Sequence, residues 1–191
     1  RIYNKKKLSL LFIGSFAQKK GVNIAFDTMN ELNRTYNIQT SLVIIGGFPG
    51  NTIVMDENVQ YLGMLNKNSE EDYNTFCNEF RNADLLIFPT RAEYHGIVNC
   101  EAAAFGLPIF ATNTGGVSTY VIDGFNGFTF PISATGKDYA QKINECLCNS
   151  QMENLSKNSR KLYEDKFNWS TWERRVSQII NDVCNHKEFA P

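Results

Sequence analysis

The chain has 191 residues, of which 42% are hydrophobic and 13% aromatic, and its formal net charge is −1. That length suits one sizeable α/β domain and is usually too short for two, so we predict a single domain over residues 1–191. The balanced charge disfavours nucleic acid as a partner, and no apolar run reaches the ~20 residues of a transmembrane segment.

Short apolar runs that end at glycine or proline alternate with helical patterns along the first two thirds of the chain. These runs predict strands at residues 8–13, 41–45, 59–62, 84–88, 108–112 and 127–130. Nearly continuous hydrophobicity of this kind is typical of strands that are buried on both faces. The first strand ends at Gly14 and the second at Gly46-Gly47, after which Pro49-Gly50 predicts a turn.

Apolar residues at steps of three and four predict the helices between those strands. These helices cover residues from about 21 to 36, from Ser69 onward and 97–105, with a short helical turn near 118–122. Ser69 and Asp72 form a helix-cap pattern. The side chains of this second helix that we expect in the core are Tyr73, Phe76, Cys77 and Phe80. The alternation predicts an α/β fold: a Rossmann-like, doubly wound parallel sheet with helices on both faces.

The rest of the chain has a helical pattern. Segments at about 137–148 and 152–165 precede a last helix at about 169–185, for which Ser170-x-x-Glu173 predicts a capping box. The apolar stripe of that helix consists of Trp169, Trp172, Val176, Ile179 and Val183.

Five cysteines and two histidines give little support to a metal site or a disulfide framework. No two cysteines form a Cys-x-x-Cys pair, and His95 and His186 lie far apart in the sequence. We therefore expect free thiols in a reducing compartment and no bound metal.

The glycine-rich ends of the predicted strands are where a ligand is expected, because doubly wound sheets bind ligands beyond the carboxyl ends of their strands. Gly14, Gly46-Gly47, Gly63, residues 90–96 and residues 113–116 all lie at those ends.

Two glutamates, Glu93 and Glu101, lie on either side of a predicted helix start at this edge. Gly96 lets a ligand approach the backbone, and the free amides of Ile97 and Val98 can bind a phosphate. Glu101 lies about one turn further on, where a carboxylate can accept hydrogen bonds from ribose hydroxyls, and Glu93 would face the other end of the ligand. The structural alternative, a solvated loop acid and an ordinary helix acid, carries equal weight on spacing alone.

Lys20 follows the first strand and can reach a diphosphate at the same edge as a point charge, whereas Lys19 fits a solvated surface lysine better. His95 could donate to a sugar or phosphate, although a lone loop histidine is more often structural. The loop at residues 113–116 could either present amides to an anion or simply turn the chain. A glycoside hydrolase pair is a poorer interpretation of Glu93 and Glu101, because it needs no neighbouring phosphate cradle.

At these residues the chain resembles the C-terminal, donor-binding half of GT-B glycosyltransferases, most closely retaining family 4, the glycosyl transferases group 1. The matching pieces run in family order from about residue 8 to residue 131. They are Gly14 to Gly21, Val59 to Gly63, Pro89-Thr90, Glu93-x7-Glu101-Ala102, Gly106-x-Pro108, Gly115-Gly116 and Asp123-Gly-x-Asn-Gly127.

The resemblance implies a role for each site residue. Lys20 and Glu93 would be the catalytic pair, with Lys20 on the donor diphosphate and Glu93 on the hydroxyls of the donor sugar. The diphosphate would also meet the first loop at Gly14 and Ser15, and the amides after Gly96 at Ile97 and Val98. Glu101 would bind the ribose, and Gly63, Met64 and Leu65 would border the nucleobase.

The family's chemistry needs little beyond positioning and charge. Transfer in the family retains the anomeric configuration by same-face attack, with the diphosphate helping to deprotonate the acceptor. The resemblance therefore implies no cofactor and no metal, and a substrate such as a UDP- or GDP-sugar.

Three positions depart from the family pattern. Ser15 stands where an arginine is common, which leaves Lys20 to carry the diphosphate largely alone. His95 replaces a usual phenylalanine, and Thr119 replaces a common glutamate, and both substitutions bear on donor identity.

Family members also carry an N-terminal Rossmann-like domain that binds the acceptor, and 191 residues cannot contain it. We expect this chain to be the C-terminal half of a GT-B architecture, cytoplasmic, either free or peripheral at the inner face of the membrane. Its partners would be the nucleotide-sugar donor and, through the missing domain, an acceptor glycan or lipid-linked glycan. The chain alone is expected to bind nucleotide weakly and to transfer nothing.

Two other functions remain open from the sequence. One is a catalytically inert nucleotide-sugar-binding module, and the other is a related GT-B nucleotide-sugar epimerase. Sugar transfer that depends on Glu93 would exclude the first, and isomerisation of the donor without an acceptor would indicate the second.

Overall fold

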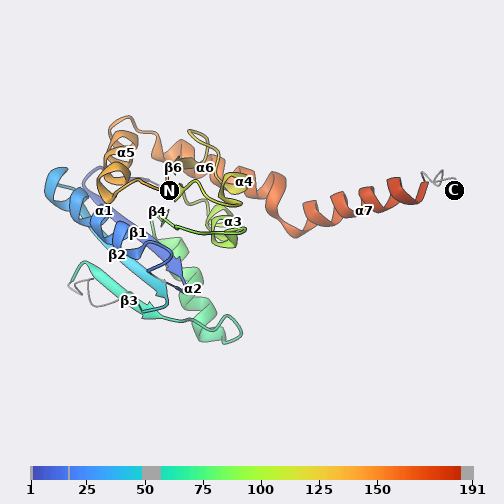
Figure 1. Cartoon of the computed structure of the whole chain (residues 1–191), viewed down its shortest axis with the longest axis horizontal. Helices are drawn as coiled ribbons and strands as arrows, with labels where there is room; N and C mark the ends of the chain where they lie inside the picture. The colour runs from blue at the N-terminus through green and yellow to red at the C-terminus, as the bar shows by residue number, and fades with distance from the viewer. Residues whose placement is uncertain (1, 17, 49–56, 186–191) are drawn as a thin grey trace.

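A six-stranded parallel sheet forms the centre of the computed structural model, which describes residues 2–16, 18–48 and 57–185. The strand order is β3-β2-β1-β4-β5-β6 and every neighbouring pair is parallel (Figure 1). The strands are β1 (Lys7–Gly14), β2 (Gln39–Gly46), β3 (Val59–Gly63), β4 (Leu85–Phe88), β5 (Ile109–Thr112) and β6 (Gly127–Phe130). The predicted doubly wound α/β sheet is therefore confirmed.

Helices cover both faces of this sheet. They are α1 (Val22–Thr35), α2 (Glu70–Asn82), α3 (Ile97–Ala104), α4 (Val117–Tyr120), α5 (Gly136–Cys148), α6 (Met152–Leu162), the π-helical turn η1 (Tyr163–Phe167) and α7 (Trp169–Asn185). One hydrophobic cluster joins the sheet to α1 and α5, and a second joins the opposite face to α2, α3 and α4.

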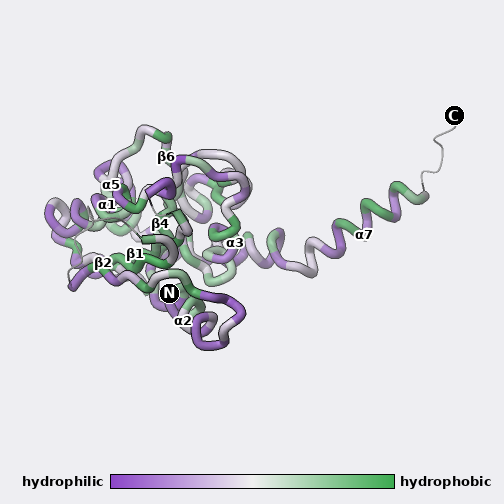
Figure 2. Tube along the Cα trace, turned by 60° about the horizontal axis from the view of Figure 1, so that its bottom comes forward, coloured by the Kyte–Doolittle hydropathy of each residue, from purple (hydrophilic) through white to green (hydrophobic). Residues whose placement is uncertain are grey.

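Alternation along the central strand explains why there are two cores. Leu10 and Phe12 of β1 belong to the cluster with α1 and α5, whereas Leu11 belongs to the cluster with α2 and α3. Successive side chains of a strand point to opposite faces, so a strand covered on both faces has to be apolar throughout. Figure 2 shows the resulting hydrophobic trace along the central strands.

The strand order reverses between β1 and β4, the two central strands. Loops that leave neighbouring strands in opposite directions open a crevice at such a switch point, and this is where doubly wound folds bind their ligands. The two loops concerned are residues 15–21, between β1 and α1, and residues 89–96, between β4 and α3.

Two local predictions were wrong. Tyr73 was expected in the core, but it is 50% exposed, while Phe76, Cys77 and Phe80 of the same helix are buried. The predicted capping box at Ser170 does not cap α7, because Asn168 is extended and its Oδ1 accepts the N–H of Thr171 at 2.9 Å. The turn η1 extends the preceding helix by five residues, to Phe167, and Asn168 follows it directly. The predicted turn at Pro49-Gly50 lies outside the described residues.

Helix α7 projects away from the rest of the molecule (Figures 1 and 2). The predicted apolar stripe is present, but it is not buried by the described residues: Trp172, Ile179 and Val183 are all more than half exposed. Among the described residues, no helix combines the length and the hydrophobicity needed to cross a membrane.

Candidate functional site

The two loops at the switch point are in direct contact. Gly21 has a φ of 78°, and a Cβ there would lie 2.1 Å from the carbonyl oxygen of Pro89. The N–H of Arg91 donates to the carbonyl of Lys19 at 3.2 Å. Because only glycine permits both that dihedral and that approach, Gly21 brings Lys20 beside the segment that follows β4.

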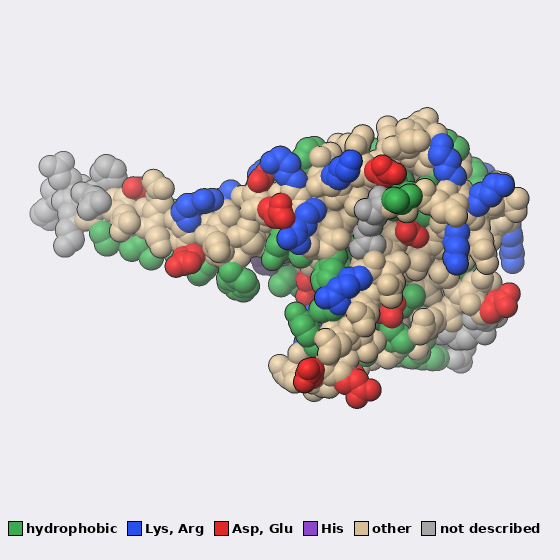
Figure 3. Space-filling model, turned by 180° about the vertical axis from the view of Figure 1, so that it is seen from behind, with side chains coloured by type: hydrophobic (Ala, Val, Ile, Leu, Met, Phe, Trp, Pro, Cys, Tyr) green, Lys and Arg blue, Asp and Glu red, His purple; other side chains and the backbone are tan. Residues whose placement is uncertain are grey.

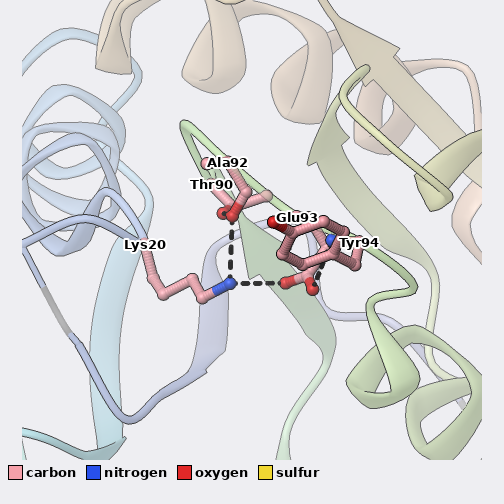
Figure 4. A network of polar contacts seen from close by, with 5 residues as sticks. All are labelled: Lys20, Thr90, Ala92, Glu93 and Tyr94. Atoms are coloured by element: carbon pink, nitrogen blue, oxygen red, sulfur yellow. Dashed lines mark hydrogen bonds and ion pairs between the residues drawn. The ribbon is translucent and has the colours of Figure 1, made fainter.

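Lys20 and Glu93 form an ion pair at this contact (Figure 4). The distance from Nζ of Lys20 to Oε2 of Glu93 is 2.6 Å, and Nζ also donates to the carbonyl of Ala92 at 3.1 Å. The two side chains are only 19% and 15% exposed. Two residues 73 positions apart in the sequence are thus brought together, as the predicted catalytic pair requires.

Opposing influences act on the pKa of Glu93. Partial burial works to raise it, but the hydrogen bond and charge of Lys20 lower it, as do the amides of Tyr94 and Gly96. The result is a pKa below the ordinary value of a glutamate. Glu93 is therefore an ionised hydrogen-bond acceptor at neutral pH and is poorly suited to act as a general acid.

Gly96 begins α3 in the left-handed conformation, with a φ of 66°. A Cβ there would lie 2.6 Å from Nδ2 of Asn99 and 3.2 Å from Cγ of Glu93. Among the residues that the structure describes, no side chain caps this helix, so the first amides, those of Ile97 and Val98, have no side-chain acceptor there. Free amides at a helix start favour an anion, and Glu93 lies beside Gly96, the residue that precedes them.

Asn99, which the sequence analysis did not single out as a site residue, is fully buried in the first turn of α3. Neither Nδ2 nor Oδ1 has a hydrogen-bond partner among the described residues. An unsatisfied buried amide costs about 1–3 kcal/mol, and this one lies against Gly96, where a Cβ would be 2.6 Å from its Nδ2. In the sequence, the sign of this residue was a polar side chain, Asn99, directly after the apolar pair Ile97 and Val98 at the predicted helix start.

The loop after β5 supports Glu93 from behind. A Cβ on Gly115 would lie 1.6 Å from the carbonyl oxygen of Glu93, and the N–H of Gly116 donates to the carbonyl of Tyr94 at 2.8 Å. The backbone of this loop therefore packs directly against the Glu93 segment.

Glu101 lies in a different environment from Glu93. Its Oε1 accepts from Nζ of Lys67, in the loop between β3 and α2, at 2.5 Å. Both side chains line a cavity of about 600 Å³, which aromatic residues of α2, α4, η1 and α7 also line. Ile97 lines the cavity too, whereas Lys20 and Glu93 do not.

The predicted site residues therefore form two groups. Gly14 belongs with Lys20, since a Cβ on Gly14 would lie 2.9 Å from Cβ of Lys20. Ser15 is exposed in the same loop. Gly63 ends β3, and Met64 and Leu65 follow it in the loop that also carries Lys67; Met64 is 67% exposed. The helix start at Gly96, Ile97 and Val98 lies between Glu93 and Glu101 in the sequence.

Potential metal ligands are scattered in the part of the chain that the structure describes, where no three His, Cys, Asp or Glu side chains gather. All five cysteines are free thiols. Burial raises the pKa of the Cys146 thiol to about 11, which makes it unreactive at neutral pH.

Sequence comparison points to one family. The model of the glycosyl transferases group 1 family matches residues 2–162. An uncharacterized glycosyltransferase of Methanocaldococcus jannaschii is 25% identical over 185 residues, which make up 96% of this chain and 51% of the relative. The chain thus spans about half the length of that relative.

Solved structures share the fold. The Anabaena protein HepE in complex with UDP-glucose has a TM-score of 0.73 at 18% identity, covering 92% of this chain and 49% of its own. WaaG, a glycosyltransferase involved in lipopolysaccharide biosynthesis, has a TM-score of 0.71 at 23% identity, covering 92% and 48%. Both comparisons place the chain on one half of a larger architecture.

Proposed function

Because the chain belongs to the glycosyl transferases group 1 family, we propose that it is the donor-binding half of a retaining glycosyltransferase. The donor would be a nucleotide-diphospho-sugar, and the acceptor a glycan or a lipid-linked glycan. The observation that carries this proposal is the Lys20–Glu93 pair, which lies at the switch point of the sheet.

The pair suits a donor that has a diphosphate next to a sugar. The ammonium group of Lys20 has three N–H bonds to donate. The carbonyl of Ala92 and the carboxylate of Glu93 accept two of them. A phosphate oxygen can accept the third N–H of Lys20, or it can replace Glu93 as the acceptor. In the second case the Glu93 carboxylate accepts a hydrogen bond from a sugar hydroxyl. The amides of Ile97 and Val98 add further donors for the phosphate.

Catalysis by this site would consist of positioning and charge stabilisation. A diphosphate leaving group gains negative charge as the glycosidic bond breaks, and Lys20 with the α3 amides lies where that charge would develop. Glu93 remains ionised and would orient the sugar ring. No cofactor and no metal are part of this proposal, and the retaining outcome follows from same-face attack by the acceptor.

The rest of the enzyme would bring the acceptor. The chain covers about half of its relatives, so we assign acceptor binding to a second domain. The neighbours support the choice of substrate class: HepE was solved with UDP-glucose, and WaaG is named for lipopolysaccharide biosynthesis.

A nuclear magnetic resonance titration of the 191-residue chain tests this proposal. UDP, GDP and ADP are added in turn, and at least one is expected to shift the amide signals of Lys20, Ile97 and Val98. Lys20→Met should weaken this binding about tenfold, since it removes a charged hydrogen-bond donor. Lys19→Met is the matched control, because Lys19 is exposed and should leave the affinity unchanged. Unmoved signals with all three nucleotides would refute the proposal.

A further inference from the structure

Lys67 connects two elements that the proposed donor site uses separately. It lies in the loop between β3 and α2, three residues after Met64, and its Nζ lies 2.5 Å from Oε1 of Glu101 on α3. The pair therefore joins the loop expected to border the nucleobase to the carboxylate expected to bind the ribose. Figure 3 shows hydrophobic side chains gathering at the base of α7, and residues of α7 share a cavity with this pair.

A buried ring helps to fix the position of this ammonium group. Nζ of Lys67 lies 4.1 Å from the ring centroid of Phe76, which is only 5% exposed and packs edge-on against Phe80. Exposed lysine–glutamate pairs are usually too mobile to orient anything. Here a cation–π contact adds a second attraction, so that Lys67 is held from two directions.

Glu101 keeps one oxygen available in this arrangement. Lys67 contacts Oε1, and Oε2 has no partner among the described residues. The Glu101 side chain is 27% exposed, so a ligand at the cavity can reach it. A carboxylate offers about four lone-pair directions on its two oxygens, so it can hold a lysine and a hydroxyl at once.

We infer that Lys67 is a positioning residue for ribose recognition: it holds Oε1 of Glu101 so that Oε2 accepts a ribose hydroxyl. This inference rests on the proposed function, because it assumes that the ligand is a nucleoside diphosphate. Lys67 acts through Glu101 and does not contact the phosphates. The phosphates are assigned to the separate group of residues around Lys20. Its contribution should therefore depend on the ribose hydroxyls of the ligand.

The test is a comparison of two ligands on the whole 191-residue chain. Binding of UDP and of 2′,3′-dideoxyuridine diphosphate is measured for the native chain and for Lys67→Met, which keeps the apolar stem but removes the charge. If the titration above selects another base, the corresponding guanosine or adenosine pair is used. Lys142→Met is the matched control, since Lys142 forms a similarly exposed 2.5 Å pair with Glu145 on α5.

Lys67→Met should weaken UDP binding about three- to tenfold and leave binding of the dideoxy analogue unchanged. In a Glu101→Gln background, Lys67→Met should have no further effect on UDP, because its target is already altered. Lys142→Met should change neither affinity.

Three results would overturn the inference. Equal weakening for both ligands would place Lys67 on the phosphates, and tighter UDP binding would make it a competitor of the ribose; in both cases the proposed function would stand. Failure of the native chain to bind any nucleoside diphosphate would overturn the inference and the proposed function together.

Discussion

Lys20 and Glu93 show how one contact can meet both a structural and a chemical requirement. Each carries a charge that would be costly to bury alone, and each is mostly shielded from solvent in this structure. Pairing the two side chains offsets part of that cost at the switch point. The same two side chains are the ones that the proposed diphospho-sugar donor would contact.

The pH dependence of stability provides a test of this pair. The pKa of Glu93 is lower in the folded chain than its ordinary value, so the pair stabilises the folded chain fully above the ordinary glutamate pKa of about 4.3. This stabilisation is lost as the pH falls through the lowered, folded-state value. Glu93→Gln should therefore lower the free energy of unfolding by about 1 kcal/mol at neutral pH and by much less at strongly acid pH.

Urea denaturation of the native chain and of Glu93→Gln, from neutral to strongly acid pH, measures the difference in their free energies of unfolding. Glu173→Gln, at an exposed position of α7, serves as the control and should show no pH-dependent difference from the native chain. A constant difference between Glu93→Gln and the native chain at every pH would contradict the prediction.

At the scale of elements, glycines bring the loops of the sheet edge into backbone contact. Gly21 brings the loop after β1 against Pro89, and Gly115 brings the loop after β5 against Glu93. In both places a Cβ would meet a carbonyl oxygen at well under the contact distance. The candidate site is thus built from three loops, each of which limits the movement of the next.

Two alanine substitutions separate backbone strain from loop contact. Gly115 and Gly124 both have positive φ, of 53° and 72°, but a Cβ on Gly124 would meet nothing within 4 Å. Gly124→Ala should cost about 1 kcal/mol of stability from its dihedral alone. Gly115→Ala should cost about 3 kcal/mol or more, because it also pushes Glu93 away.

Denaturation curves measure both costs, and nucleotide titration reports the effect on the site. Gly115→Ala is expected to weaken nucleoside diphosphate binding, and Gly124→Ala to leave it unchanged. Equal loss of stability in the two variants would show that the Gly115 contact is unimportant.

At the scale of the molecule, α7 differs from every other long helix because its apolar stripe contacts little of the described chain. Trp172, Ile179 and Val183 are spaced so that they lie on one face, and all are more than half exposed. An exposed apolar stripe of this length is typical of a surface that binds another protein surface. Both tryptophans of the chain, Trp169 and Trp172, lie at its start.

Charging this stripe should change association and leave folding intact. Ile179→Lys combined with Val183→Lys should alter the free energy of unfolding by less than about 0.5 kcal/mol, since exposed positions contribute little. The same variant should self-associate less than the native chain at high concentration, as measured by sedimentation velocity. Ser177→Lys with Asn181→Lys adds the same charge to exposed polar positions of the helix and should leave association unchanged. Equal self-association of the two variants would contradict the prediction.

Local patterns in the sequence were sufficient to predict the sheet and the order of its elements. Short, nearly continuous apolar runs are typical of strands buried on both faces, and glycines at their ends predict the edge where ligands bind in doubly wound sheets. Residues 127–130, for example, were predicted as a strand with the bounds that the structure shows. The prediction for Tyr73 failed because burial depends on neighbours that are distant in the sequence. The prediction for Ser170 failed because no local pattern of the chain indicates the turn η1.

The sequence by itself determined which residues carry charge and which elements hold them, because both depend on residue type and short-range spacing. Only the tertiary structure decided the partners: Lys20 with Glu93 across 73 residues, and Lys67 with Glu101 across 34. Side-chain pairing depends on how strands order themselves in the sheet and on how closely glycines let their loops approach. Those distances are set by the packing of the whole chain, and no single segment of the sequence contains them.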